Sequence, residues 1–427
     1  MTLSWLSIFR LGAVQMALGA VVVLMTSTLN RLMVVELALP AVLPGLLVAL
    51  HYGIQITRPN WGFLSDTSGK RSFWIVAGMA VLASGGMLAA TAVWLLETAF
   101  WPGLGLSILA YALIGVGVGA CGTSLLALLA TATAPERRPA AATITWLMMI
   151  LGIALTAATV GAVLEPYSPE RMLAIVAVVT AGAFAVTGLA VWGVERRVHA
   201  EREPEEQPFL QGLREVWAEP DARRFTVFVF LSMTAYFMQE LILEPYAGLV
   251  FGFSPGQSTS LSGAQNGGVF LGMVTVGIAG TALRIGSLRT WVIAGCIGSA
   301  AAQVGLAALG PMGPGAPLVP MVVAMGFFNG MFAVAAIGSM MALAGQGREK
   351  REGTRMGLWG AAQAIAAGFG GLAGAAAADA MRSVMADAPA FGAVFLAEAA
   401  LFLAAASMAF RMMSKPSAPE TALVPGE

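Results

Sequence analysis

Charged residues are scarce in this chain. Lysine, arginine, aspartate and glutamate make up 11% of its 427 residues, whereas hydrophobic residues make up 58%. A soluble protein has about 25% charged residues, so this composition excludes a soluble globular domain. The mean hydropathy of +0.80 agrees with that exclusion. We therefore expect an integral membrane protein, in contact with the lipid bilayer.

Cysteine and histidine are almost absent, with two residues of each type. Cys121 and Cys296 fall inside apolar runs, so we interpret them as small buried side chains and not as a disulfide. The chain lacks a Walker loop, a dinucleotide fingerprint, a Cys/His metal cluster and a nucleophile elbow. We therefore expect neither an enzyme activity nor a nucleic-acid partner.

Long apolar runs dominate the rest of the chain. A helix that crosses a bilayer needs roughly 20 apolar residues, and the chain offers two sets of six such runs. This pattern predicts an all-α integral membrane protein with twelve transmembrane helices. We place the first set near 11–30, 44–64, 72–96, 103–130, 140–163 and 171–194, and the second near 225–250, 258–282, 289–310, 317–344, 354–378 and 389–411.

One long polar segment separates the two sets. We predict an N-terminal six-helix bundle over 1–194, a cytoplasmic linker over 195–224, a C-terminal six-helix bundle over 225–412 and a disordered tail over 413–427. An amphipathic stretch near 209–217 is predicted to lie on the membrane surface. Clusters of lysine and arginine fall on one side of the bundle, and the positive-inside rule makes that side cytoplasmic, with both termini on it.

A short charged loop follows the second apolar run. Gly62 and Gly69 flank it and let the backbone turn, and Asp66 lies at a helix end where it can pair with cations. Lys70 and Arg71 hold the loop on the cytoplasmic side. This pattern, G-x-L-x-D-x-x-G-K-R, resembles the signature loop of the major facilitator superfamily. We therefore treat Asp66, Lys70 and Arg71 as candidates for a structural salt bridge or a gate.

The two halves of the chain repeat one another. A Gly-x-x-x-Gly pair occurs in the fourth run at 115–119 and again in the tenth run at 326–330, and a degraded copy of the charged loop occurs at 280–289. Small residues at this spacing let helices approach closely in lipid. Two similar six-span halves joined by a cytoplasmic linker predict the major facilitator architecture of two pseudo-symmetric bundles.

Polar side chains inside the second run form the first candidate site. His51, Gln55 and Arg58 are spaced at i, i+4 and i+7, which predicts one shared helix face. A charge at the centre of a membrane helix costs about 2.5–3.5 kcal/mol on insertion scales, so these residues are candidates for binding a pigment or another ligand. A neutral His51 imidazole suits a metal ligand, including one for the magnesium of a chlorin, or a proton relay. The alternative is a histidine hydrogen-bonded to a neighbouring helix.

Gln239, Glu240 and Glu244 in the seventh run form the second candidate site. Pro245 disturbs the helix directly after them. The two carboxylates are one turn apart and repel each other, so at least one needs a proton or a cationic partner. This favours proton coupling or ligand binding. The alternative is a carboxylate near the periplasmic end that is hydrated or paired with Arg31.

A polar belt over 26–30 ends the first run, and Arg31 and Glu36 follow it. We expect the belt to face a periplasmic vestibule, and we expect Arg31 and Glu36 to form an internal salt bridge more readily than a ligand contact. The other polar residues within the membrane runs are expected to be isolated and to form interhelical hydrogen bonds; they are Gln265, Asn266, Asn329, Gln363 and Glu398.

Two stretches closely resemble the PucC/LhaA family of phototrophic bacteria. The first is TSTLNRLMVVELALPAVLPG at 26–45 with LHYGIQITRPNWG at 50–62, and the second is QELILEPYAG at 239–248. The resemblance covers essentially all twelve predicted spans. It implies a major facilitator fold adapted to the assembly of light-harvesting complexes in the intracytoplasmic photosynthetic membrane. It also implies association with bacteriochlorophyll, with antenna polypeptides and with pigment-synthesis enzymes.

Three functions remain open at this point. The first is an assembly factor that receives bacteriochlorophyll and delivers it to antenna polypeptides, with His51 as a tentative magnesium ligand. The second is a proton-coupled transporter of a porphyrin-like or other amphipathic solute, in which His51, Arg58 and Glu240 line a central cavity. The third is a membrane scaffold that has lost transport. The scarcity of acids inside the first six runs argues against the second.

Overall fold

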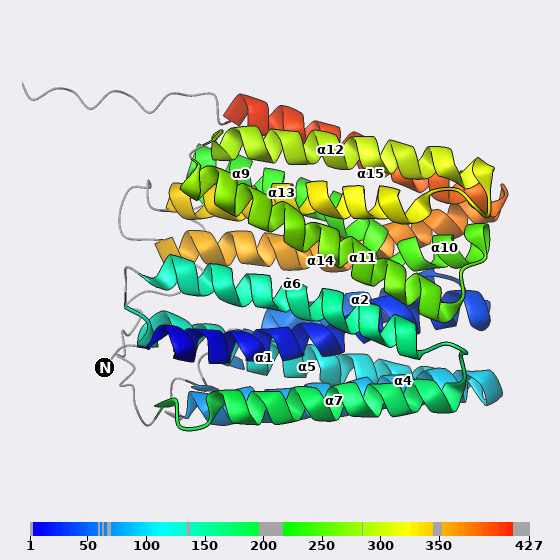
Figure 1. Ribbon diagram of the computed structural model, residues 1–427, viewed down its shortest axis with the longest axis horizontal. Coiled ribbons are helices and arrows are strands. Elements are labelled where there is room, and N and C mark those ends of the chain that lie inside the picture. Colours follow the sequence, from blue (N-terminus) through cyan, green and yellow to red (C-terminus); the bar gives the residue numbers. More distant parts are fainter. Residues whose placement is uncertain are drawn as a thin grey trace, which may run out of the picture.

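The computed structural model describes residues 3–58, 60–61, 64–65, 70–134, 137–195, 217–283, 285–344 and 352–412. Within these ranges the chain folds into helices and contains no strand. The helices lie side by side along one long axis, with the N-terminus at one end of the bundle (Figure 1). We call that end the N-terminal end and the opposite end the far end.

Helices from the first half of the chain occupy one side of the bundle (Figure 1). Some of them depart from regular α geometry, because α1 continues into two π-helical segments and α2 ends in a 3₁₀ turn. The elements are α1 (Trp5–Val23) with π segments Leu24–Leu29 and Leu32–Glu36, α2 (Val42–Ile54) with the turn Gln55–Thr57, α4 (Arg71–Thr98), α5 (Phe100–Ala132), α6 (Arg138–Val163) and α7 (Pro169–Val191).

Helices from the second half occupy the other side. The first of them is broken, since α9 and α10 are bent by 41° at a 3₁₀ turn. The elements are α9 (Pro220–Met238) with the turn Gln239–Leu241, α10 (Leu243–Phe251), α11 (Pro255–Gly277) with the π segment Ile278–Ala282, α12 (Leu288–Leu309), α13 (Leu318–Ala344), α14 (Glu352–Arg382) and α15 (Asp387–Met412).

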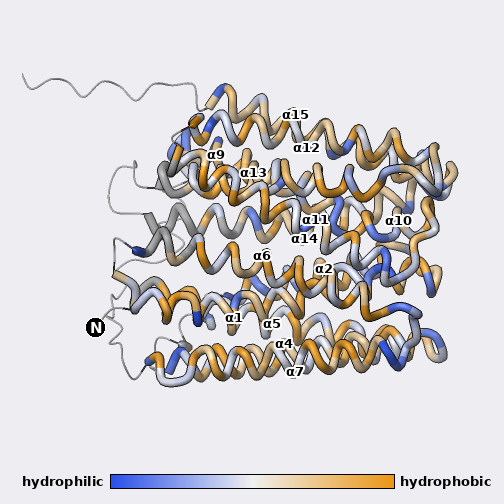
Figure 2. Tube along the Cα trace, in the orientation of Figure 1, coloured by the Kyte–Doolittle hydropathy of each residue, from blue (hydrophilic) through white to orange (hydrophobic). Residues whose placement is uncertain are grey.

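Hydropathy agrees with a membrane-embedded bundle. In the part of the chain described above, nine helices are long and apolar enough to cross a membrane, or ten if the bent pair α9–α10 counts as one span. Helix α2 is apolar but shorter. Hydrophobic residues cover the middle of the helices, and many hydrophilic residues gather towards the two ends (Figure 2). The chain is thus a multi-pass membrane protein, while the count of twelve spans stays a prediction.

The two halves meet along two helix pairs. Helix α6 packs along α11, and α2 packs along α14. Their hydrophobic cores also interlock: Leu241 of the second half belongs to the core of the first, and Ile150 of the first half belongs to the core of the second. The boundary between the halves is therefore a packed interface, over which residues distant in the sequence are placed together.

The repeated glycine pairs lie where helices touch. A methyl group added at Gly115 on α5 would lie 2.8 Å from the His51 carbonyl oxygen on α2. Gly326 and Gly330 on α13 press in the same way against the backbone of α11. Each pair thus lets one helix approach another directly, which is the role that small residues have in membrane bundles.

Some predicted features fall outside the described residues. Asp66, most of the predicted linker with its amphipathic stretch, and the tail at 413–427 are among them. Helix α9 begins at Pro220, inside the range predicted as linker. The reason is local: proline is favoured in the first turn of a helix, and Asp221 places a negative charge at the positive end of the helix dipole.

Candidate functional site

The polar belt of the first helix is buried between the two halves. Residues 26–30 lie in and beside the π-helical segment Leu24–Leu29, and Ser27, Thr28 and Asn30 are at most 5% exposed. The expectation that this belt faces a vestibule is therefore wrong. It packs against α9, α10 and α11, because buried hydroxyl and amide groups need hydrogen-bond partners and these helices supply them.

The break between α9 and α10 lies directly opposite the belt. The Leu241 carbonyl at this break accepts a hydrogen bond of 2.9 Å from the Asn30 amide, and the Thr259 hydroxyl on α11 donates to Thr28 at 3.1 Å. The break and α11 thus each supply a hydrogen-bond partner to the belt. Such π-helical and 3₁₀ interruptions occur often at functional sites.

Glu244 is the buried acid of this contact. Its side chain is 1% exposed, and its Oε1 accepts hydrogen bonds from the hydroxyls of Ser27 on the first helix and Ser262 on α11, the latter at 2.6 Å. The carboxyl group therefore joins three helices from both halves. Glu240, one turn earlier, is half-buried and faces Thr26 of the same belt.

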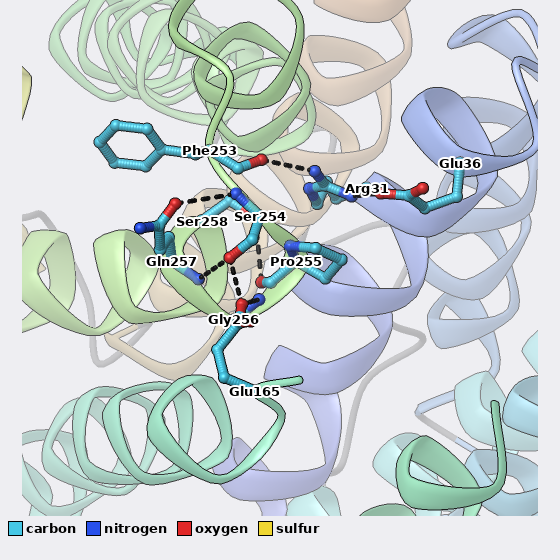
Figure 3. A network of polar contacts seen from close by, with 9 residues as sticks. All are labelled: Arg31, Glu36, Glu165, Phe253, Ser254, Pro255, Gly256, Gln257 and Ser258. Atoms are coloured by element: carbon cyan, nitrogen blue, oxygen red, sulfur yellow. Dashed lines mark hydrogen bonds and ion pairs between the residues drawn. The ribbon is translucent and has the colours of Figure 1, made fainter. Parts of the chain in front are cut away.

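Arg31 and Glu36 are in contact, as the sequence predicts. Arg31 Nη1 lies 2.5 Å from Glu36 Oε1, and Arg31 Nη2 donates to the Phe253 carbonyl at 2.7 Å (Figure 3). Arg31 is 2% exposed and also interacts electrostatically with Glu244. Burial, with the carboxylates of Glu97 and Glu36 nearby, raises the pKa of Tyr167 in the adjacent loop to about 12. This tyrosine is therefore neutral at physiological pH.

Glu165, which follows α6, contacts the start of α11 at the far end of the bundle. Its Oε1 accepts a hydrogen bond from the Ser254 hydroxyl and another, at 3.1 Å, from the Gly256 backbone N–H (Figure 3). Ser254 and Gln257 also form a capping box at the start of α11. A carboxylate from the first half thus lies at the positive N-terminus of a helix from the second half. The sequence contains the Ser254–Gln257 capping pattern but no pattern that identifies Glu165 as a partner of this helix start.

His51 lies at the end of α2, Gln55 in the following 3₁₀ turn and Arg58 directly after that turn. Hydrogen bonds join the three side chains, which agrees with the shared face that their spacing predicts. Arg58 Nη2 donates to Gln55 Oε1, so the Gln55 amide nitrogen faces His51 and lies 2.9 Å from its Nε2. The amide can only donate there, which leaves Nε2 as the acceptor and places the ring proton on Nδ1. The hydrogen bonds of the three side chains run in one direction: Arg58 donates to Gln55, and Gln55 donates to His51.

Arg58 is the exposed end of this series of hydrogen bonds. His51 and Gln55 are buried, whereas Arg58 and the neighbouring Gly53 are exposed. Tyr52 interacts electrostatically with both Arg58 and Glu240, and its ring packs edge-on against Phe237 of α9. An arginine, a tyrosine and a carboxylate from both halves are thus placed near one another. No acidic partner of Arg58 occurs within the described ranges.

The Gln239 side chain lies apart from Glu240 and Glu244, with which it was grouped by sequence. Although it directly precedes Glu240, its side chain turns into the second half, where its Oε1 accepts a hydrogen bond from Gln303 Nε2. The same nitrogen donates to Glu398 Oε2 at 2.6 Å, and all three residues are fully buried. Glu398 on α15 thus forms an interhelical hydrogen bond to α12, as predicted, and so does Asn329 on α13, which accepts a hydrogen bond from Ser299 at 2.6 Å. No motif or spacing in the sequence identifies Gln303 as a member of this network.

The charged loop is described only in part. Lys70 is exposed and precedes α4, whereas Arg71 is buried and donates to the Ala127 carbonyl at 3.4 Å. The carboxylate of Glu195 accepts hydrogen bonds from the backbone N–H groups of Arg71 and Ser72, at 2.7 and 3.1 Å. Glu195 thus caps the start of α4, which has no side-chain cap of its own.

Metal ligands are sparse. Within the part of the chain that the structure describes, no group of three or more His, Cys, Asp or Glu side chains is placed to hold a metal ion. A chlorin magnesium needs one free lone pair. His51 does not offer it in this arrangement, because Nε2 accepts from Gln55 and Nδ1 bears the proton. Ligation by His51 stays a prediction that requires Gln55 to move.

Comparison with known protein families shows which family the chain belongs to. The sequence profile described as "PUCC protein" matches residues 28–416. The chain belongs to this family. It is 68% identical to "Bacteriochlorophyll synthase 44.5 kDa chain" of Rhodobacter capsulatus, over 96% of each chain. It is also 30% identical to "Protein PucC" of Cereibacter sphaeroides, over 93% of this chain and 90% of that protein.

Solved structures place this PucC-family protein in the major facilitator fold. A bacterial homologue of the human lysosomal transporter Spinster matches it with a TM-score of 0.71 at 15% identity, covering 96% of this chain and 97% of that one. The nucleoside transporter NupG matches with a TM-score of 0.67 at 12% identity, covering 96% and 99%. At these identities the likeness establishes the fold alone, which agrees with the sequence prediction.

Proposed function

We propose that this PucC-family protein binds a bacteriochlorophyll-type pigment in the photosynthetic membrane and delivers it to light-harvesting antenna polypeptides. The observation that supports this most is the 68% identity, over 96% of both chains, to a protein named as a bacteriochlorophyll synthase chain. Membership of the PUCC family agrees with a pigment-related role.

A cluster of aromatic and charged side chains suits such a cargo. It consists of Tyr52, Phe237, Arg58 and Glu240. A tetrapyrrole has a large flat apolar face and a few polar groups at its edge. Aromatic side chains supply apolar area with polar tips, and a small number of polar groups fix orientation. Tyr52 and Phe237 pack edge-on with ring centroids 6.1 Å apart. In this proposal they contact the ring, while Arg58 holds a carbonyl or carboxyl oxygen at its edge.

The proposal does not depend on magnesium ligation. His51 has no free lone pair while Gln55 occupies it, so its role here is to hold Gln55 and, through Gln55, to orient Arg58. Arg58 is a donor only and stays charged, which makes it a fixed anchor for an oxygen of the cargo.

The remaining parts of the proposal concern topology and partners. Both termini are cytoplasmic, since lysine and arginine gather on that side. Antenna polypeptides receive the pigment, and pigment-synthesis enzymes supply it. This chain performs no catalytic step in the proposal; the synthase activity in the name of its relative would belong to a separate enzyme.

The test is a native purification. The protein is extracted with a mild detergent from a pigment-making cell, its absorption spectrum is recorded, and co-purified chains are identified. We expect bacteriochlorophyll and antenna polypeptides, and we expect Arg58→Met to reduce the pigment bound per protein. Arg224→Met is the matched control, because Arg224 is an exposed arginine whose ion-pair partner, Asp221, lies on its own helix α9. A colourless preparation without such partners would contradict the proposal.

A second candidate is proton-coupled transport of a porphyrin-like or other amphipathic solute. The transporter fold and the half-buried Glu240 between the halves favour it. Proton-dependent uptake into vesicles that is lost in Glu240→Gln would support this function. Uptake that is absent, or unchanged in the variant, would argue against it.

A further inference from the structure

The two halves are in close contact at the far end. We define the far-end seam as three layers: the belt of α1 against α10 and α11, the end of α6 against the start of α11, and the start of α2 against the end of α14. In Figure 1 these elements converge at the end opposite the N-terminus.

The first layer consists of buried polar side chains. Ser27, Thr28 and Asn30 of the first half bond to Glu244, Thr259 and the Leu241 carbonyl of the second. Arg31 adds its hydrogen bond to the Phe253 carbonyl. All four side chains from the first half are at most 5% exposed. Separating the halves here would break each of these buried hydrogen bonds at once.

The second layer brings backbones into contact. A methyl group added at Gly161 on α6 would lie 2.6 Å from the Gly256 carbonyl oxygen, and one added at Gly256 would lie 2.5 Å from the Gly161 carbonyl oxygen. Further along, a methyl group at Gly263 would lie 2.7 Å from the Ala158 backbone nitrogen. Glu165 then caps α11 across the same boundary. Reciprocal glycine contact leaves no gap between α6 and α11 at this end.

The third layer closes the side formed by α2 and α14. The Val42 backbone N–H donates to Asp379 Oδ2 at 2.7 Å, and a methyl group added at Gly45 would lie 3.2 Å from the Ala375 Cβ. Contact continues to Gly368, where an added methyl group would lie 3.2 Å from the Tyr52 Cβ. Beyond that point, towards the N-terminal end, Gly53 has open space around it, and Ile56 and Arg58 are exposed.

We propose that the far-end seam stays shut while the protein works, so that its ligand enters and leaves only on the side of the N-terminal end. The exposed Arg58 and Gly53 mark that side. The protein is then a one-sided binder on a transporter fold: alternating access, in which both ends open in turn, is not part of its cycle.

Cysteine labelling tests whether the seam is shut. In a background with Cys121→Ala and Cys296→Ala, Ala375→Cys places one thiol inside the seam, where Ala375 is 0% exposed. Ala386→Cys, just beyond the same helix and exposed, is the matched control. A seam that is open 1% of the time labels about 100-fold more slowly than an open site. With a charged, membrane-impermeant maleimide on the purified protein, we expect at least that difference. Labelling rates within tenfold of each other would overturn the proposal.

A disulfide tests whether opening is needed, and this arm rests on the proposed function. Gly45→Cys with Ala375→Cys in the same background places two Cβ atoms 3.2 Å apart, so a separation of a few tenths of an ångström brings them to the roughly 3.5–4.5 Å that a disulfide needs. The double variant replaces the native protein in a pigment-making cell, and the cross-linked fraction is measured by thiol alkylation. We expect antenna absorbance equal to that of each single variant at near-complete cross-linking. Loss of absorbance in the cross-linked variant alone, restored by reductant, would overturn the proposal.

The two failures are distinguishable. If a strain without the protein assembles its antenna normally, the proposed function fails, and the maleimide rates alone decide the seam. If that strain lacks antenna and the single-cysteine variants restore it, the cross-linked variant decides whether the far end must open.

Discussion

The Ser27 hydroxyl donates a hydrogen bond to Glu244 Oε1 across the boundary between the two halves of the chain, over 217 residues of sequence. Ser262 donates to the same oxygen. The contact joins the π-helical part of the first helix to the broken seventh span, so the two irregular elements stabilise each other.

Removing the Glu244 carboxyl group should destabilise the protein. Glu244→Ala leaves the hydroxyls of Ser27 and Ser262 without their acceptor, and an unsatisfied buried polar group costs about 1–3 kcal/mol. Glu244→Gln keeps an acceptor oxygen in the same place. We expect a lower melting temperature in detergent for the alanine variant than for the glutamine variant. Equal melting temperatures would mean that these hydrogen bonds contribute nothing.

Two glycines of α11 give a matched pair. A methyl group added at Gly272 would lie 2.9 Å from the Phe327 carbonyl carbon of α13, whereas one at Gly267 meets nothing within 4 Å. Gly272→Ala should cost about 1–3 kcal/mol through overpacking, and Gly267→Ala should gain up to about 1 kcal/mol of helix propensity. Thermal unfolding of the two variants checks this. Similar effects of the two changes would contradict the packing of α11 against α13.

The buried network of Gln303, Gln239 and Glu398 predicts non-additive effects. Gln303→Leu leaves both Glu398 and the Gln239 carbonyl oxygen without their donor, whereas Glu398→Leu leaves the Gln303 amide with Gln239 as its remaining acceptor. Replacing both partners by apolar groups can be nearly neutral. We therefore expect the double variant to be more stable than Gln303→Leu alone, because it no longer buries an unpaired carboxyl group. A strictly additive double-mutant cycle would show that the two side chains are not coupled.

The tautomer of His51 follows from Arg58. We expect the neutral ring to carry its proton on Nδ1, seen in the ¹⁵N NMR spectrum of histidine-labelled protein. The chain has only one other histidine, His199, and a His199→Gln variant assigns the signals. Arg58→Met frees the Gln55 amide to rotate, so a mixture of tautomers should follow. A proton on Nε2 in the unaltered protein would contradict the hydrogen bonds that run from Arg58 through Gln55.

Local spacing explains what the sequence predicts well. His51, Gln55 and Arg58 share a face because they are one turn apart, and Arg31 reaches Glu36 five residues away. The fold follows from apolar run length and from glycine pairs, which do not depend on distant contacts. The spacing does not show the position of Gln239, because consecutive residues of a helical turn point in different directions and its partner Gln303 lies 64 residues away.

Long-range pairing explains what the sequence does not predict. Glu165 meets Gly256 across 91 residues, and Gln303 meets Glu398 across 95. In each case neither partner has a local pattern that identifies the other. The belt over 26–30 reads as polar from the sequence, but only the packing of α10 and α11 decides that it is buried.

The belt also has a consequence for biogenesis. The Asn30 amide donates to the Leu241 carbonyl, which lies 211 residues further along the sequence. A ribosome that adds 5–20 residues per second needs about 10–40 s to synthesise that stretch. Throughout that interval the serine, threonine and asparagine groups of the belt lack the partners that the second half supplies. Water or the translocon must therefore provide hydrogen-bond partners for these groups until the helices from α9 to α11 are inserted.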